Sequence, residues 1–325
     1  MITPGDPAAP AADAQGMTVV ARTQAQLVRR RFFRHRAAMI SLVVFALLLI
    51  LSFSATGIGP IPGWWKHDYT TVGSVVEGGS PTLSVVPTFL GGDGMHLGDH
   101  PFGQDNKGID YFALTMRGTQ VSIMIAFIVG ALGTLLGVLI GAAAGFFRGW
   151  TETILMRFTD IIIVMPLLAI VSVLANRVGN AGPFWLAVVI ALFTWTGLAR
   201  IVRGEFLSLR EKEFIEAARA VGTPAWRIIR KHILPNTIGV IVVSATLSIA
   251  GAVLLETALS FLGFGVKPPD TSLGRLISDY QSAFASRPWL FFWPGLFIVL
   301  IALTVNFIGD GLRDAFDPRQ NKVRS

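Results

Sequence analysis

The chain has 325 residues, of which 52% are hydrophobic and only 14% are charged, whereas soluble globular domains carry about 25% charged residues. With a mean hydropathy of +0.61, this composition excludes an ordinary soluble domain and indicates an integral membrane protein. The chain has no cysteine, which excludes disulfides, thiolate metal sites and a cysteine nucleophile. It also lacks the phosphate-binding sequence G-x-x-x-x-G-K-[ST], so any nucleotide hydrolysis is expected to belong to a partner.

Six largely uncharged stretches predict transmembrane helices, because a helix needs roughly 20 residues to cross about 30 Å of hydrocarbon. We expect these helices over residues 37–56, 118–147, 154–176, 183–200, 236–263 and 288–309. The basic tail of residues 1–36 followed by an apolar stretch resembles a signal peptide, but this stretch is longer than a signal core and further spans follow it. We therefore expect an all-α integral membrane protein with a retained first helix and six spans.

The distribution of Lys and Arg predicts which side of the membrane each segment faces. If the tails of residues 1–36 and 313–325 and the segments 148–160 and 200–232 are cytoplasmic, 20 of the 27 Lys and Arg residues lie on that side. We therefore expect both termini in the cytoplasm. The net charge of +7 then reflects topology in a lipid membrane, and no nucleic acid partner is expected.

Residues 57–116 form a connector of about sixty residues, which is too long for a simple link between two helices. Its apolar anchors predict a small packed external element or a docking surface for an external partner; they are Trp64, Trp65, Tyr69 and Phe89. His96, Asp99 and His100, with His67 nearby, are candidate metal ligands. Three ligands in a loop rich in Gly and Asp make a poor site, so no metal is expected.

Residues 204–235, between the fourth and fifth spans, carry helix start and stop signals although no span lies there. Ser208 and Glu211 have the spacing of a capping box. Gly222 suits the end of the helix that would follow, because glycine readily adopts the left-handed conformation common at that position. Between these signals lie apolar residues at helical spacing, which are Phe214, Ala217, Ala218 and Val221.

A second short helix is predicted directly after this glycine. Thr223 and Pro224 suit its N-cap and first helical position, and Pro235 is expected to end it. The result is a helix, a glycine corner and a helix that project from the membrane. Periodicity alone leaves two interpretations open: a rigid element that fits a groove of another protein, or a pair of amphipathic helices lying on the inner leaflet.

The order of residues in this loop resembles a known family. Glu216-Ala217-Ala218, then Gly222, then Leu234-Pro235 resembles the E-A-A-x3-G-x9-I-x-L-P signature of the permease subunits of bacterial ABC importers. His232 replaces the isoleucine of that signature, and the sequence from His232 to Asn236 is similar to the oligopeptide, dipeptide and nickel branch of the family.

Further motifs in the correct order extend this resemblance over most of the chain. Residues 103–122 are similar to the G-T-D-x-x-G-R-D…G-x-R-x-S-L stretch before the second span, with Ile109 and Gln120 in place of the usual arginines. Residues 256–265 resemble the exit of the fifth span. Residues 306–318 resemble the C-terminal pattern of the second, C-type permease of each pair.

The resemblance implies the fold of an ABC type I importer permease in a bacterial inner membrane, with the permease core at residues 117–312. It implies a heterodimer with a second permease subunit, two ATPase subunits and an external substrate-binding protein. No cofactor is expected on this chain, since ATP and Mg²⁺ would bind the ATPase partners. The resemblance also implies that residues 211–234 couple transport to the ATPases, and the expected coupling residues are Glu216, Ala217, Ala218, Gly222, Leu234 and Pro235.

Polar and small residues within the spans are further candidates. Glu256 is expected either to be a structural hydrogen-bonding group or to line the path or gate, because a lipid-facing carboxylate is costly. Asn306 is expected to satisfy a neighbouring helix or to contact substrate, and Asp160 to pair with Arg157. A stripe of small residues is expected to pack against another span of this chain or against the paired permease; its members are Gly133, Gly137, Gly141 and Gly145.

These patterns predict a permease subunit of an ATP-driven importer for di- or oligopeptides, which is not itself an enzyme. An ion-gradient-driven secondary transporter is the alternative, but that class usually shows inverted repeats and several intramembrane acidic residues. A membrane enzyme is a third class, but the spans offer no Ser/His/Asp cluster or carboxylate dyad, so no catalytic residue is expected. The solute is left open among dipeptides, oligopeptides, nickel complexes and glutathione-like compounds.

Overall fold

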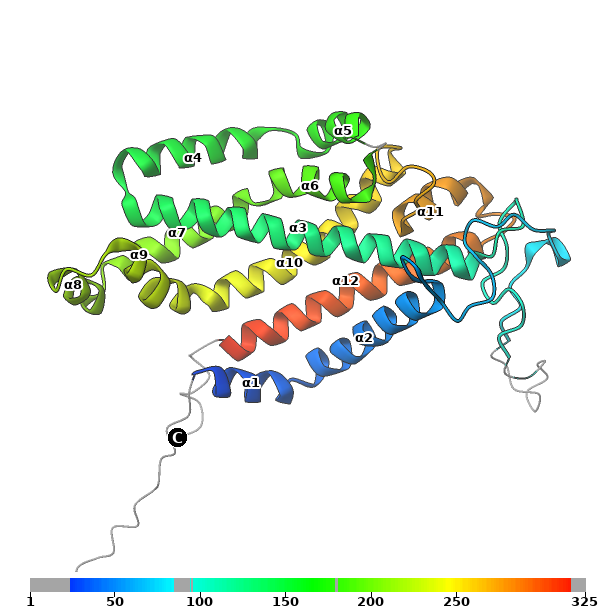
Figure 1. Cartoon of the computed structure of the whole chain (residues 1–325), viewed down its shortest axis with the longest axis horizontal. Coiled ribbons are helices and arrows are strands. Elements are labelled where there is room, and N and C mark those ends of the chain that lie inside the picture. Colours follow the sequence, from blue (N-terminus) through cyan, green and yellow to red (C-terminus); the bar gives the residue numbers. More distant parts are fainter. Residues whose placement is uncertain (1–23, 85–93, 95, 179–180, 317–325) are drawn as a thin grey trace, which may run out of the picture.

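The computed structural model describes residues 24–84, 94, 96–178 and 181–316. It is mainly helical, and its long helices lie side by side along the long axis of the molecule (Figure 1). The elements in chain order are α1 (Gln24–Arg34), α2 (Arg36–Thr56), β1 (Gly57–Ile58), β2 (Ile61–Pro62), η1 (Glu77–Gly79), α3 (Tyr111–Phe147), α4 (Gly149–Val164), α5 (Leu167–Val178), α6 (Pro183–Thr194), α7 (Thr196–Arg210), α8 (Glu213–Ala220), α9 (Ala225–Ile228), the π-helical turn η4 (Ile229–Ile233), α10 (Leu234–Phe261), α11 (Leu273–Tyr280), η5 (Gln281–Ala283) and α12 (Trp289–Phe316).

Four helices in the described part of the chain are long and apolar enough to cross a membrane. They are α2, α3, α12 and the continuous helix from the start of α9 to the end of α10. Two further pairs reach this length and apolarity only when taken together: α4 with α5, bent by 87°, and α6 with α7, bent by 45°. The described residues therefore hold four to six candidate spans.

The break between α4 and α5 has a local cause. Pro166 follows Met165, whose backbone is extended at φ −67° and ψ 135°, because the residue before a proline is sterically pushed out of the helical region. The stretch predicted over residues 154–176 is therefore two helices rather than one straight span. The stretch predicted over 183–200 is also two helices, because α6 ends at Thr194 and α7 continues to Arg210.

Other helix bounds differ from the sequence-based expectation. The helix α3 begins at Tyr111 rather than near residue 118, because the Asp110 carboxylate caps it by accepting a hydrogen bond of 2.7 Å from the Ala113 amide. The long loop therefore covers residues 57–110. In the connector after α10, the short helix α11 was not predicted, although Ser272 caps it through a 3.1 Å bond from the Arg275 amide.

Apolar side chains form two buried clusters. The larger one joins α2, α3, α10, α11 and α12, and its fully buried members include Tyr111, Ile125, Leu259 and Leu273. The smaller one lies where the C-terminal end of α3 meets α7, α8 and α9. The helices of the second cluster are thus fixed to the transmembrane body by packing, since burial of apolar surface is the main stabilising term.

The long loop packs on the ends of α3, α11 and α12. Phe102 stacks on Trp293 with ring centroids 3.8 Å apart, and the Tyr280 hydroxyl donates to Asp105 Oδ2 at 2.9 Å. Burial, together with the neighbouring Asp105 carboxylate, raises the pKa of Tyr280. Of the expected anchors, Trp65 and Tyr69 pack against the larger cluster, Trp64 is exposed, and the fourth, at position 89, lies outside the described residues.

Gln120, which stands where the family pattern has arginine, joins α3 to the end of α2. Its Nε2 donates to Ser52 O at 2.8 Å, to Thr56 Oγ1 at 2.8 Å and to Gly57 O at 2.9 Å. Gly57 is the C-cap of α2, where a backbone carbonyl lacks a partner within the helix, whereas Ser52 O also accepts from the Thr56 hydroxyl at 3.2 Å. The glutamine therefore satisfies the C-terminal end of α2 in the buried interior.

Candidate functional site

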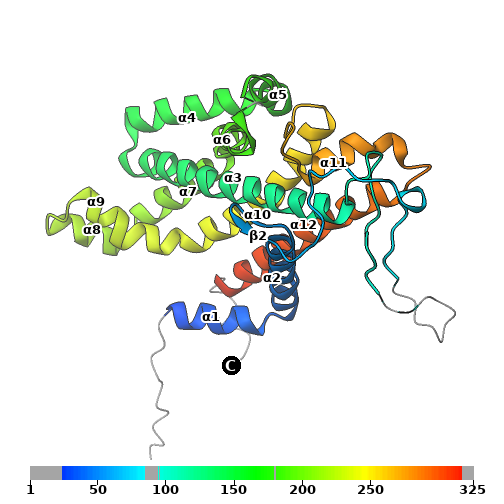
Figure 2. The same cartoon turned by 45° about the vertical axis from the view of Figure 1, so that its right-hand side comes forward.

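The helices α8 and α9 lie at one end of the molecule, and the long loop lies at the opposite end (Figures 1 and 2). The end of α12 lies against the first part of α10, which follows α9 and η4, because Phe316 is close to Gly239. The start of α2 meets the same end of α12, where His35 Nε2 is 3.4 Å from Asp314 Oδ2. The helix pair therefore projects from the end of the molecule at which the first and last described helices also lie.

Gly222 forms the corner between α8 and α9. The Thr223 amide donates to Ala218 O at 3.0 Å and the Gly222 amide donates to Arg219 O at 2.9 Å, which is the hydrogen-bond pattern of a Schellman motif. Gly222 has φ +75°, and a Cβ added there would meet none of the described atoms within 4 Å. Backbone conformation rather than crowding therefore favours glycine at this corner.

The inward face of this helix pair is held against the transmembrane body. Ile215 of α8 and Ile228 of α9 are fully buried in the smaller cluster, together with Phe206 of α7. The Arg210 guanidinium donates to Phe146 O at 2.6 Å, and the Arg219 guanidinium lies 5.5 Å from the centre of the Phe146 ring. The pair is thus braced on α3 and α7 from several sides.

The outward face carries apolar side chains that the described chain leaves in solvent. The exposed fractions are 46% for Phe214, 81% for Val221 and 68% for Trp226, and Ala217 is also exposed. We call these four residues the docking face. Exposed apolar residues on neighbouring elements commonly mark an interaction site.

The remaining expected coupling residues lie on α8 and at the start of α10. Glu216 is exposed on α8, Ala218 is partly buried against the smaller cluster, and Leu234 is partly buried at the start of α10. Pro235 does not end the second helix as expected: α9 continues through the π-helical turn η4 into α10, and this proline lies in the first turn of α10. The helix is continuous through this position, and the proline, which has no amide hydrogen, follows directly after the π-helical turn η4; breaks in the regular helical hydrogen-bond pattern commonly occur at proline.

The expected capping box is also wrong. Ser208 lies inside α7, which runs to Arg210, and Glu211 is the C-cap of that helix rather than part of the first turn of α8. The N-cap of α8 is Lys212. The sequence analysis did not identify Ile215 and Ile228 as the residues that pack α8 and α9 against the smaller cluster. Their helical spacing from neighbouring apolar residues was a signal that could have found them.

Glu256 is fully buried and joins three helices. The hydroxyls of Ser260 and Ser272 donate to its Oε1 at 2.7 and 2.6 Å, and that of Ser122 donates to its Oε2 at 3.3 Å. These serines belong to α10, to the cap of α11 and to α3. The Ser122 hydroxyl in turn accepts a 3.1 Å bond from the Leu273 amide. A buried carboxylate is thereby satisfied within the protein, as burial of a polar group requires.

The small-residue stripe of α3 faces α6 and α7. A Cβ added at Gly141 would lie 2.4 Å from Ala199 O, and one added at Gly137 would lie 2.9 Å from Leu198 Cβ. At Gly145 the nearest atom is Phe206 Cβ at 2.6 Å, whereas at Gly133 it is Thr194 Oγ1 at 3.4 Å. The glycines therefore let two helices of the same chain approach closely.

Two ion pairs join α4 to α7. Arg203 Nε donates to Glu152 Oε1 at 2.7 Å, and Arg200 donates to Asp160 Oδ1 at 2.5 Å. Asp160 was expected to pair with Arg157, and this prediction is wrong because Asp160 pairs with Arg200. Asn306, another expected polar candidate, is partly buried on α12.

Comparison with known proteins identifies the class. A family profile described as "Binding-protein-dependent transport system inner membrane component" matches residues 133–322, and one described as "N-terminal TM domain of oligopeptide transport permease C" matches residues 23–72. The chain therefore belongs to the family of inner membrane components of binding-protein-dependent transport systems. It is a multi-pass permease subunit of an ABC transporter and is not itself catalytic.

Individual curated proteins show which members of the family this chain is similar to. The chain is 38% identical over 299 residues to the oligopeptide transport system permease protein OppC of Mycobacterium tuberculosis, covering 92% of this chain and 96% of that protein. It is 36% identical over 303 residues to the protein of the same name from Haemophilus influenzae, covering 93% and 91%. A solved inward-facing structure of the MetNI methionine ABC transporter matches 63% of this chain and 96% of its own, with a TM-score of 0.52 and 20% identity. That last likeness concerns the fold alone.

Proposed function

We propose that this chain is the OppC-type permease subunit of an ATP-driven importer of oligopeptides. The substrate class follows from the curated relatives, which match over about nine tenths of the chain. Each bent helix pair counts as one span, which gives six spans. Both termini and the docking face lie in the cytoplasm, and the long loop lies outside. The distribution of Lys and Arg supports this orientation.

The docking face is the contact with an ATPase subunit, and the exposure of its apolar side chains is the observation that supports this assignment. The face is apolar, exposed and mounted on a helix pair that is braced against the spans through Ile215 and Ile228. A rigid mounting transmits movement, because packed interiors resist compression. Closure of the ATPases on ATP shifts the permease between inward- and outward-open states only if the contacts differ between the two states.

The path itself is shared with a second permease subunit, and an external binding protein delivers the peptide to the side of the long loop. Glu256 has a structural role in this scheme: it ties α11 to α3 and α10 through three hydroxyl groups. Two ATPase partners hold ATP and Mg²⁺. This assembly accounts for the absence of a phosphate-binding sequence in the chain.

Peptide uptake by the reconstituted transporter tests the proposal. The double variant Val221→Ser/Trp226→Ser should abolish ATP-dependent uptake of a labelled oligopeptide while the chain remains folded, because the docking face loses its apolar contact area. Trp150→Ser is the matched control, since Trp150 is an 83% exposed tryptophan at the start of α4 and outside the docking face. Uptake that persists without ATPase subunits and collapses with an ionophore would establish the secondary-transporter alternative instead.

A further inference from the structure

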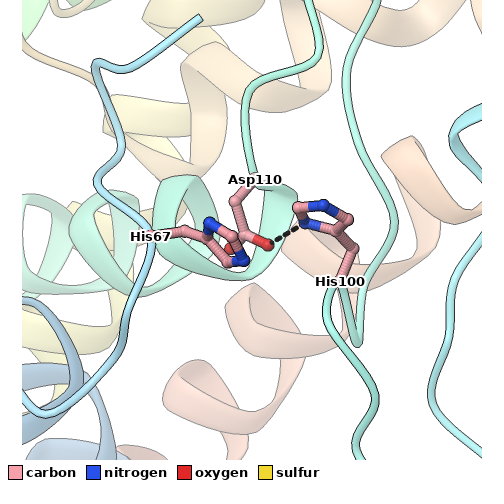
Figure 3. A group of neighbouring side chains, drawn as sticks. All are labelled: His67, His100 and Asp110. Carbon is pink, nitrogen blue, oxygen red and sulfur yellow. Dashed lines mark hydrogen bonds and ion pairs between the residues drawn. The ribbon is translucent and has the colours of Figure 1, made fainter. Parts of the chain in front are cut away.

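Two histidines of the long loop and the aspartate that caps α3 lie close together (Figure 3). His67 follows the β1–β2 hairpin, His100 lies in the second half of the long loop, and Asp110 caps α3. One side-chain nitrogen or oxygen of each residue lies within 4.8 Å of the other two. The candidate ligands weighed from the sequence were His96, Asp99 and His100 with His67 nearby, and no metal was expected there. In the structure Asp99 pairs with Lys66, whose ammonium lowers the pKa of that carboxyl.

The three side chains are already oriented by their neighbours. His100 Nδ1 is 2.7 Å from Asp110 Oδ2, and the His67 and His100 rings stack with centroids 4.6 Å apart. The other carboxylate oxygen, Asp110 Oδ1, accepts from the Ala113 amide at 2.7 Å and from Trp65 Nε1 at 3.0 Å. One oxygen of this aspartate is therefore fixed and the other faces the histidines.

One ring nitrogen of the cluster, on His67, lacks a hydrogen-bond partner among the described residues. His67 Nε2 is buried and has no hydrogen-bond partner among the described residues. Buried polar atoms are nearly always paired, so an unpartnered nitrogen on the ring of a histidine in this cluster requires an explanation. A metal ion held between His67, His100 and Asp110 would supply the missing partner.

The chemistry of the donor set supports a borderline metal ion. Two imidazole nitrogens and one carboxylate oxygen suit Zn²⁺, and in tetrahedral sites Zn²⁺ lies about 2.0 to 2.2 Å from such atoms. Ligand atoms at these bond lengths are about 3.3 Å apart, so the widest separation of up to 4.8 Å must shorten by roughly 1.5 Å. The 2.7 Å contact between His100 Nδ1 and Asp110 Oδ2 must lengthen by about 0.6 Å, with the ion replacing that hydrogen bond. Trp65, through its bond to Asp110 Oδ1, then holds the carboxylate in place as an outer partner.

We propose that His67, His100 and Asp110 form a binding site for a divalent transition-metal ion, with Zn²⁺ as the best fit. The ion clamps both halves of the long loop to the N-terminal end of α3. It is a structural ion bound outside the spans and is not the transported solute. The proposal does not depend on the nature of that solute.

Binding of ZnCl₂ to the full chain in lipid nanodiscs tests the proposal, with the protein purified through a tag free of histidine. We expect one saturable Zn²⁺ site by calorimetry and a melting temperature that rises with Zn²⁺ concentration, because a ligand that binds the folded state stabilises it. MgCl₂ should leave the melting temperature unchanged, because Mg²⁺ prefers oxygen ligands.

Variants separate a metal site from simple packing of the imidazole rings. His67→Phe keeps an aromatic ring against His100 and disturbs no hydrogen bond of Asp110, so its melting temperature without metal should stay near that of the original protein. Its affinity for Zn²⁺ should fall by at least about 10-fold, as losses around metal sites typically do. His96→Gln is the matched control, since His96 is exposed in the same loop and outside the cluster.

Three results would overturn the proposal. The first is absence of saturable Zn²⁺ binding by the original protein. The second is equal Zn²⁺ affinity in the original protein and the His67→Phe variant. The third is an equal loss of affinity in His96→Gln, which would show diffuse binding by surface histidines. None of these measurements uses transport activity, so failure of the metal site is distinguishable from failure of the importer assignment.

Discussion

The close contact between α3 and α7 can be tested by adding one methyl group. In Gly141→Ala, the new Cβ would lie 2.4 Å from Ala199 O and 2.8 Å from Val202 Cβ. The nearest atom is backbone, so the helices must separate. Gly204→Ala on α7 is the matched control, because a Cβ there meets none of the described atoms within 4 Å.

The expected magnitude follows from two opposing terms. Replacing a helical glycine with alanine stabilises the helix by about 0.5 to 1 kcal/mol, and this gain is common to both variants. Overpacking a well-packed interface costs about 1 to 3 kcal/mol, and only Gly141→Ala incurs it. The two variants should therefore differ by about 1 to 3 kcal/mol in the free energy of unfolding, with Gly204→Ala the more stable.

Unfolding of the purified chain in mixed micelles by increasing sodium dodecyl sulfate measures this difference, with helix content followed by circular dichroism. Gly141→Ala should unfold at lower detergent fraction than the original chain, and Gly204→Ala at equal or higher fraction. Equal midpoints for the two variants would refute the assigned contact between the stripe and α7.

Three further substitutions test individual contacts by thermal unfolding. Glu256→Ala should destabilise by about 3 kcal/mol or more, because it strands three buried hydroxyls at about 1 to 3 kcal/mol each, whereas Glu256→Gln keeps an acceptor for two of them. Gly222→Ala should cost about 1 to 2 kcal/mol from its left-handed backbone alone, and Gly197→Ala, at an uncrowded helical site, should not. Gln120→Leu should cost about 1 to 3 kcal/mol by leaving the Gly57 carbonyl at the end of α2 without this donor, and Gln120→Arg should cost less because it keeps the donors.

Each of these predictions has a clear contrary result. Equal stability of the alanine and glutamine variants at Glu256 would show that the serine hydroxyls find other partners. An unchanged melting temperature for Gly222→Ala would mean that the corner relaxes away from its positive φ. If Gln120→Arg were as destabilising as Gln120→Leu, donation to the α2 carbonyls would not be the role of this side chain.

Local patterns in the sequence predicted several parts of the fold because their causes are local. Uncharged stretches gave the long helices, and the glycine at position 222 marked the corner after α8. Pro166 also carried a clear signal, since proline disfavours helix in the residue before it, but the span was predicted to run through it. The cap of α11 by Ser272 was similarly visible in the sequence and was missed.

Other features depend on contacts between distant segments and could not be predicted from local patterns. The meeting of His67, His100 and Asp110 requires the long loop to fold back on α3, and no periodicity describes that loop. Arg200 rather than Arg157 pairs with Asp160 because α7 packs beside α4. The burial of Ile215 depends likewise on the position of α8 against α3 and α7.

The central claim is that the docking face contacts an ATPase subunit. Because the chain has no cysteine, Val221→Cys introduces a single thiol at a position that is 81% exposed. With a second cysteine placed in the groove of the ATPase, disulfide formation in membranes with and without ATP measures the contact. We predict a cross-link from Val221→Cys whose yield changes with nucleotide, and no cross-link from Ile215→Cys, because Ile215 is buried. Absence of a cross-link at every position from Phe214 to Trp226 would contradict this claim and favour helices that lie on the membrane surface.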